Sequence, residues 1–133
     1  MNQRKKLNRS KKQRIGRVQA LIKGTAVRPR LVVNRSNRYI SAQLIDDAKG
    51  ATLFSVTNAG GKKAVGAKAG AAKSSIVKPT GKKSEQAFAL GEAIAKKAIE
   101  KGIAQVVFDR RSYQFHGRVK QFAEGAKKGG LKI

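Results

Sequence analysis

The chain has 133 residues, no cysteine, and a formal net charge of +24 from 31 basic and 7 acidic residues. The length fits one domain, and the lack of cysteine excludes disulfides, thiolate zinc sites and cysteine nucleophiles. A charge of this size opposes compaction unless a polyanion neutralises it. Nucleic acid is therefore the first candidate partner, ahead of an anionic membrane surface and acidic proteins. No apolar run approaches the roughly 20 residues of a membrane span, so we expect no spanning helix. Of the candidate partners we choose nucleic acid and predict no membrane partner.

The first 38 residues carry thirteen basic side chains and no acidic one. Because such a segment cannot form a core, residues 1–10 are expected to be disordered in the free protein. From residue 13 to 22 a weak helical pattern places Ile15, Val18 and Ile22 on one face. We expect residues 1–22 to form a flexible basic arm that tracks phosphates, with a solubilising tail as the alternative. The segment lacks the apolar core of a secretory signal, whereas an organellar transit peptide stays open.

Three strands are predicted next, over residues 30–35, 38–45 and 52–57, with turns at 36–37 and 46–50. Pro29 favours an extended approach to the first strand. In the second strand Ile40, Ala42 and Leu44 alternate with polar residues, which is typical of a strand with one buried face. Basic and aromatic side chains gather at the end of the first hairpin. They form either an RNA contact or an ordinary exposed turn.

Residues 58–83 are rich in Gly, Ala, Lys and Ser, which predicts a mobile basic loop. A helix follows over residues 84–101, with Ser84 as N-cap and Gly102 as the stop signal. Its predicted apolar stripe consists of Phe88, Gly91, Ile94, Ala95, Ala98 and Ile99.

The last third predicts a short strand over residues 104–108 and a helix over 117–128. The turn between them combines arginines, aromatics and the only histidine of the chain. Guanidinium groups bind phosphates and flat rings stack on unpaired bases, so this turn is a candidate RNA contact. Arg118, in the first turn of the helix, can join the free backbone N–H groups there in binding a phosphate. Alternatively, Asp109 forms only a local ion pair, and one of Tyr113 and Phe115 packs beneath the turn.

These elements predict an α/β fold: a mixed sheet with helices on one face. The sheet consists of a three-stranded antiparallel meander and one further strand after a crossover helix. Residues 23–133 would form a single RNA-binding domain behind the arm at 1–22.

An enzyme is not expected. A nuclease would need clustered carboxylates to hold metal, and the periodicity directs most of the few acids to solvent. His116 with Asp109 could act as a base, but a histidine beside arginines is typical of hydrogen bonding or stacking. No metal or cofactor is therefore predicted. A histone-like protein that compacts nucleic acid would share the charge, and it is the alternative function.

Several stretches resemble one family when they are taken together. In the first half these are Lys23-Gly24-Thr25, Arg28-Pro29-Arg30-Leu31, Arg35-Ser36-Asn37, Ala42-Gln43 and Ile45-Asp46-Asp47. In the second half they are Ala98-Ile99-Glu100-Lys101-Gly102-Ile103, Val107-Phe108-Asp109-Arg110, His116-Gly117-Arg118-Val119 and Gly129-Gly130-Leu131. The chain resembles large-subunit ribosomal protein number eighteen, the universal binder of 5S ribosomal RNA.

The resemblance implies a structural constituent of the large subunit with a basic arm and a compact α/β domain. It implies binding to 5S rRNA, attachment of that RNA to 23S-type rRNA, and a place in the central protuberance beside the fifth large-subunit protein. The expected location is a cytoplasmic ribosome rather than an organellar one. Two departures from the family pattern affect the contact details: Arg111-Ser112 replaces a small glycine-type pair, and Tyr39 stands where His is common.

The predicted RNA-binding residues come from the arm, the hairpin and the last turn. They are Arg4, Lys5, Lys6, Arg9, Lys11, Lys12, Arg14, Arg17, Arg28, Arg30, Arg35, Arg38, Tyr39, Arg110, Arg111, Tyr113, His116 and Arg118.

Overall fold

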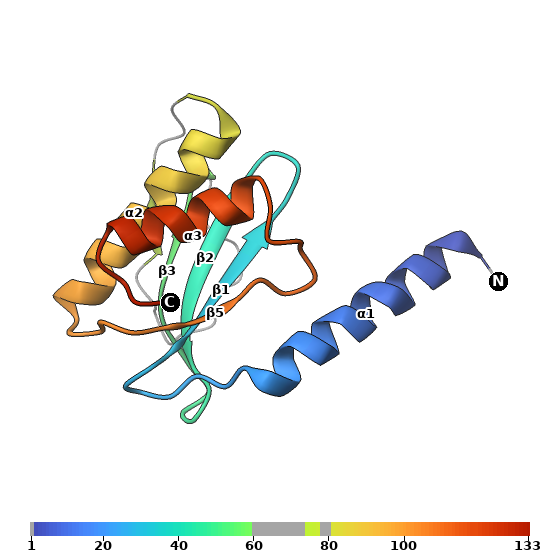
Figure 1. Cartoon of the computed structure of the whole chain (residues 1–133), viewed down its shortest axis with the longest axis horizontal. Coiled ribbons are helices and arrows are strands. Elements are labelled where there is room, and N and C mark those ends of the chain that lie inside the picture. The colour runs from blue at the N-terminus through green and yellow to red at the C-terminus, as the bar shows by residue number, and fades with distance from the viewer. Residues whose placement is uncertain (1, 60–73, 78–80) are drawn as a thin grey trace.

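The computed structural model describes residues 2–59, 74–77 and 81–133. Its elements are α1 (Gln3–Leu21), β1 (Arg30–Arg35), β2 (Ile40–Asp46), β3 (Ala51–Thr57), β4 (Ser74–Ile76), α2 (Lys83–Glu100), β5 (Val107–Asp109) and α3 (Arg118–Lys128). The strands form one mixed sheet in the order β4-β3-β2-β1-β5. Helices α2 and α3 cover one face of this sheet, and α1 projects from the side where β1 and β5 lie (Figure 1).

The meander and the added strand are confirmed. β1 pairs antiparallel with β2, and β2 pairs antiparallel with β3. β5 lies parallel to β1, with Leu31 opposite Phe108. The alternation predicted for the second strand is also found, because Ile40, Ala42 and Leu44 are buried while the residues between them are partly exposed.

The core lies between the sheet and the two helices. The sheet contributes Leu31, Val33, Ile40, Ala42, Leu44, Phe54 and Val56, and the helices contribute Ala87, Leu90, Ile94, Ala95, Ala98, Phe122 and Ala126. The two helices touch through their backbones: an added Cβ at Gly91 would lie 2.2 Å from the carbonyl oxygen of Phe122, and one at Gly125 would lie 2.2 Å from that of Phe88. These glycines set the close approach of α2 and α3 because no larger residue fits there.

Helix α2 differs from its prediction in two respects. It begins at Lys83 with Lys82 as N-cap, and Glu85 accepts the backbone N–H of Lys82 (3.1 Å), so Ser84 is not the cap. Its buried face includes Ala87 and Leu90, whereas Ile99 is exposed. The predicted stripe was wrong at these positions because α2 packs against both the sheet and α3, which shifts and widens the buried face.

The predicted strand at 104–108 is displaced and shorter. Val106 donates its N–H to the carbonyl of Lys132 (2.9 Å), and Gln105 forms a bridge with Lys132, so the C-terminal residues pair with this stretch. Only Val107–Asp109 reach β1. Leu131, beside this pairing, lies in the core and is 3% exposed.

The region predicted as a loop at 58–83 holds more structure at its ends than expected. Asn58 is buried: its Oδ1 accepts the N–H of Ile40 (2.8 Å), and its Nδ2 donates to Gln86 (3.0 Å). β4 pairs parallel with β3. The rest of the predicted loop, residues 60–73 and 78–80, lies outside the described residues.

Candidate RNA-binding surface

Helix α1 occupies most of the predicted arm. Residues 3–10, expected to be disordered, belong to this helix, because Lys, Arg, Gln and Leu are good helix formers and Asn2 caps the start by accepting the N–H of Arg4 (3.1 Å). No residue of α1 is buried. The helix therefore rests on local hydrogen bonds rather than on packing, and disorder of the free arm stays a prediction.

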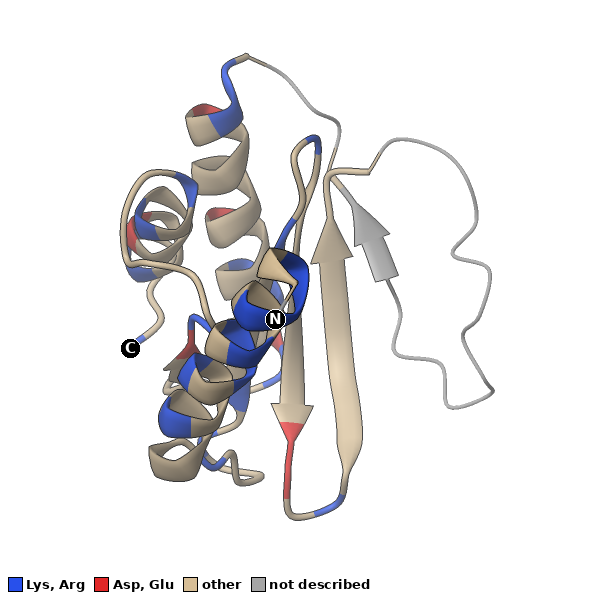
Figure 2. Cartoon of the chain, turned by 90° about the vertical axis from the view of Figure 1, so that its right-hand side faces the viewer, with Lys and Arg blue, Asp and Glu red and all other residues tan. Residues whose placement is uncertain are grey.

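The basic side chains of α1 are all exposed, and Figure 2 shows that basic positions occur along the length of the helix. They are Arg4, Lys5, Lys6, Arg9, Lys11, Lys12, Arg14 and Arg17. No acidic residue lies in this helix. Arg28, beyond the end of α1, is exposed as well. This part of the chain thus presents many exposed positive charges and no negative one.

The hairpin between β1 and β2 and the turn between β5 and α3 lie against each other. The hydroxyl of Tyr113 accepts the backbone N–H of Arg35 (3.2 Å) and donates to the carbonyl of Arg35 (2.9 Å). Arg118 Nη2 donates to the carbonyl of Ser36 (2.9 Å). Two patches that lie almost eighty residues apart in the sequence are therefore one surface. This hairpin–turn surface comprises Arg35, Arg38, Tyr39, Arg110, Tyr113, Phe115, His116 and Arg118.

Positive charge on the hairpin–turn surface is closely spaced. Partial burial and the neighbouring charge of Arg35 lower the pKa of Arg118 from its ordinary value. Among the described residues, the ion pairs of basic side chains involve Arg30, Lys120 and Lys128, and none involves this surface. An anion between these guanidinium groups would relieve their repulsion.

The aromatic residues of this surface have different roles. The Tyr113 ring is partly buried, its hydroxyl is bonded to Arg35, and the Arg35 guanidinium lies 5.3 Å from its centroid. Phe115 is 50% exposed and meets the edge of Phe108, with ring centroids 6.1 Å apart. Tyr39 is 44% exposed. Phe115 and Tyr39 therefore offer ring surface to a partner, whereas Tyr113 holds the turn to the hairpin.

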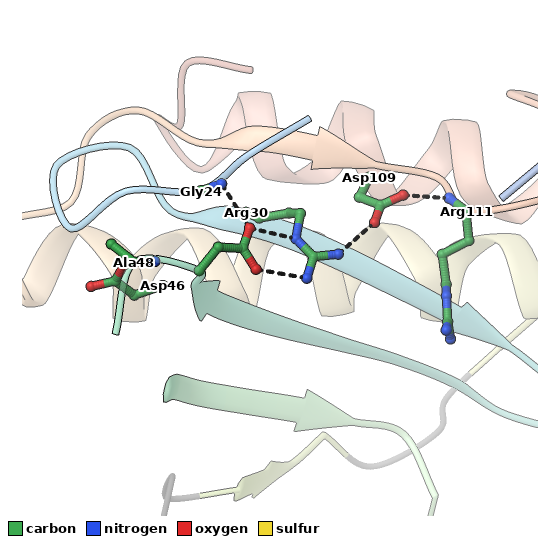
Figure 3. A network of polar contacts seen from close by, with 7 residues as sticks. Gly24, Arg30, Asp46, Ala48, Asp109 and Arg111 are labelled. Atoms are coloured by element: carbon green, nitrogen blue, oxygen red, sulfur yellow. Dashed lines mark hydrogen bonds and ion pairs between the residues drawn. The ribbon is translucent and has the colours of Figure 1, made fainter. Parts of the chain in front are cut away.

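Arg30 does not belong to the hairpin–turn surface. Its guanidinium donates to both carboxylate oxygens of Asp47 (2.9 Å each) and to Asp109 Oδ2 (2.8 Å), as Figure 3 shows. Asp47 Oδ2 also accepts the N–H of Gly24 (2.7 Å), so the network reaches the segment that follows α1. The hydrogen bonds to Asp47 raise the pKa of Arg30, and those from Arg30 lower the pKa of Asp47. Arg30 thus directs three guanidinium hydrogen bonds to partners within the protein.

Arg110 and Arg111 differ as well. Arg110 Nη1 donates to the carbonyl of Tyr113 (2.6 Å) within the turn and stays exposed. Arg111 has a left-handed backbone (φ 54°), its N–H donates to Asp109 Oδ1 (2.8 Å), and its side chain bonds to Asn34 on β1. This conformation favours glycine. The backbone thus explains a glycine-type pair at this point in the family pattern, and Asp109 partly offsets the strain here.

The exposure of Phe115 is what sequence reasoning missed. Nothing in its local pattern separates Phe115 from Tyr113, since both follow arginines in the same turn. The hydroxyl is the only signal that could have separated them, because a buried tyrosine usually finds a polar partner.

Within residues 2–59, 74–77 and 81–133, no group of three His, Asp or Glu side chains could hold a metal ion. In the same part of the chain, no helix is long and apolar enough to cross a membrane.

Comparison with known proteins agrees with the sequence pattern. The profile of the family described as ribosomal L18 of archaea, bacteria, mitochondria and chloroplasts matches residues 4–133. The "large ribosomal subunit protein uL18" of Staphylococcus aureus strain JH9 is 45% identical over 126 residues, which span 95% of this chain and 94% of the relative. The protein of the same name from strain Newman gives the same values.

Proposed function

Because the chain belongs to the ribosomal L18 family, a family of large-subunit ribosomal constituents rather than enzymes, we propose that it binds 5S rRNA and helps to attach it to large-subunit rRNA. The observation that supports this most is the contact between the hairpin and the turn, beside a helix whose basic side chains are all exposed. Two kinds of contact are then available to one RNA: general neutralisation of phosphates by α1, and defined contacts from the hairpin–turn surface.

Helix α1 and the hairpin–turn surface contribute differently to binding, because they differ in how firmly the rest of the protein holds them. Helix α1 buries no residue, so its charges supply affinity and depend on salt. The hairpin–turn surface is fixed by the Tyr113 and Arg118 hydrogen bonds, so its cations and exposed rings supply selectivity. In this proposal Tyr39 and Phe115 stack on unpaired bases, and Arg30 is a structural residue.

We also propose the partners that the family resemblance implies. These are 5S rRNA, 23S-type rRNA and neighbouring proteins that include the fifth large-subunit protein, with residues 1–22 acting as the arm and 23–133 as the RNA-binding domain.

A competition titration tests the proposal. Labelled 5S rRNA is bound at about 0.15 M salt, with transfer RNA or duplex DNA as competitor, because charge alone does not distinguish polyanions. We expect 5S rRNA to be preferred by at least about a thousandfold, the lower end of the preference that selective binders show over non-specific sites. Equal competition by all polyanions would leave a nucleic-acid-compacting protein as the better explanation.

Removal of residues 1–21 tests the role of the arm. The shortened protein should bind 5S rRNA more weakly, and the slope of log affinity against log salt should fall by about 0.7–0.9 for each phosphate that the arm neutralises. Its preference for 5S rRNA over transfer RNA should persist, because the hairpin–turn surface is intact. An unchanged slope would mean that the arm is free in the complex.

A further inference from the structure

A cleft separates α1 from the turn between β5 and α3. One part has a volume of about 300 Å³, and the adjoining part has about 150 Å³. The larger part is lined by Arg14, Arg35, Ser112, Tyr113, Gln114 and His116. Lys11, Ile15 and Arg111 line the smaller part together with Ser112 and Tyr113. Because Ser112 and Tyr113 line both, the two parts of the cleft adjoin each other. Figure 1 shows α1 on the side of the body that carries this turn.

Positive charge faces the cleft from both walls. Arg14 and Lys11 come from α1, and Arg35 and Arg111 come from the body of the protein. None of the lining residues is acidic. No ion pair found in the described part of the chain involves any of these four cations. The chemistry that fits such a space is an anion, and guanidinium groups suit a phosphate because they donate in a planar fork.

Arg35 is held both at its backbone and at its guanidinium group. The double hydrogen bond between its backbone and the Tyr113 hydroxyl fixes the end of β1, and the Tyr113 ring supports the guanidinium at 5.3 Å. A side chain held in this way loses less conformational freedom when it binds. The Arg35 guanidinium covers one face of the Tyr113 ring, so a base cannot stack on that face. Tyr113 therefore acts as a positioning residue for Arg35.

The size of the cleft restricts what can enter. Its larger part is at the lower end of the range of about 300–1,000 Å³ that holds small ligands. An RNA duplex is much too large for this volume, whereas one unpaired nucleotide is similar in size to a small ligand. Sequence-specific RNA recognition mostly uses such unpaired nucleotides.

We propose that this cleft holds the phosphate of one unpaired RNA nucleotide between Arg14 and Arg35, with Tyr113 positioning Arg35. The inference rests on the proposed function and deepens it, because it assigns one backbone position of the bound RNA to one pair of arginines. His116, exposed on the same wall, lies where it can donate to the sugar or phosphate of that nucleotide.

The experiment couples a protein change to a change in the RNA. A set of 5S rRNA molecules, each with one neutral methylphosphonate linkage in an unpaired region, is titrated with the wild type, Arg35→Gln and Lys96→Gln. Lys96 is an exposed cation on α2, so Lys96→Gln controls for the loss of one charge. Loss of one charged hydrogen-bonding group should weaken binding of Arg35→Gln about tenfold to a hundredfold, and Lys96→Gln much less.

The decisive outcome is position-specific. One neutral linkage should weaken the wild type and Lys96→Gln by a similar factor, and it should weaken Arg35→Gln clearly less, because one of the two arginines that bind this phosphate is already gone. Tyr113→Phe, which removes only the hydroxyl, should reduce the effect of the same linkage without abolishing it. Thermal unfolding of each variant shows whether it is folded. If Arg35→Gln is not folded, the same comparison is made with Tyr113→Phe or Arg35→Lys, whichever is folded.

The inference and the proposed function fail in different ways. If the wild type prefers 5S rRNA over transfer RNA but no linkage couples to Arg35, the nucleotide site is refuted and the proposed function stands. If the wild type shows no preference, the proposed function falls, and the assigned nucleotide falls with it.

Discussion

Replacing Arg30 by Met tests the ion-pair network that joins β1, β5 and the segment after α1. Methionine keeps the unbranched aliphatic stem and removes the three hydrogen bonds that the guanidinium donates to Asp47 and Asp109. The side chain of Asp109 is 0% exposed, so its carboxylate would keep only the N–H of Arg111. Asp47, with 31% of its side chain exposed, can turn to water.

The expected cost therefore comes almost entirely from Asp109. Removing one partner of a buried pair costs about 3–5 kcal/mol, because an unpaired charge stays in the interior. The half-solvated pair with Asp47 adds at most about 1 kcal/mol. We expect Arg30→Met to lower the free energy of unfolding by about 3–5 kcal/mol. That is a large share of the roughly 5–15 kcal/mol typical of a domain.

The assay is urea unfolding followed by circular dichroism at 222 nm, with Lys96→Gln as the control for removing one positive charge. The double variant Arg30→Met/Asp109→Asn should recover part of the loss, because it removes the unpaired charge along with its partner. A loss of less than about 1 kcal/mol, or a double variant that shows simple additivity, would refute the reasoning.

Three further predictions concern other parts of the chain. Arg30 holds the pKa of Asp47 below its usual value of 3.8. The stabilisation that this pair gives is therefore complete at neutral pH and is lost as the pH falls through the lowered pKa. The difference in unfolding free energy between the wild type and Asp47→Asn should shrink below about pH 4. Gly125→Ala should cost about 1–3 kcal/mol or more in urea unfolding, since its Cβ would lie 2.2 Å from the carbonyl oxygen of Phe88; Gly16→Ala, with nothing within 4 Å, should raise the helical signal instead. Phe115→Ala should weaken 5S rRNA binding by about 1–3 kcal/mol and lower the free energy of unfolding by less than about 1.5 kcal/mol. Tyr113→Ala should mainly lower the free energy of unfolding. If Phe115→Ala binds RNA as tightly as the wild type, this ring does not stack on a base.

Local patterns in the sequence predicted the elements well wherever burial follows a simple period. Alternation from Ile40 to Leu44 gave β2, and the period from Val119 to Ala126 gave α3, because each of these elements buries one face. The same reasoning predicted α2 but misplaced part of its buried face, because this helix is covered on two sides. It was wrong for residues 104–106, which pair with the C-terminal residues.

The sequence by itself predicted a polyanionic partner and determined which family the chain belongs to, because charge and motif order do not depend on folding. Only the tertiary structure decided which basic and aromatic residues share one surface. Arg30 and Arg35 lie in the same strand, yet one is held by two carboxylates and the other has no acidic partner on the hairpin–turn surface. The partners responsible, Asp109 and Tyr113, lie 79 and 78 residues away in the chain. Contacts over such separations depend on how β5 is added to the sheet, and no local period records them.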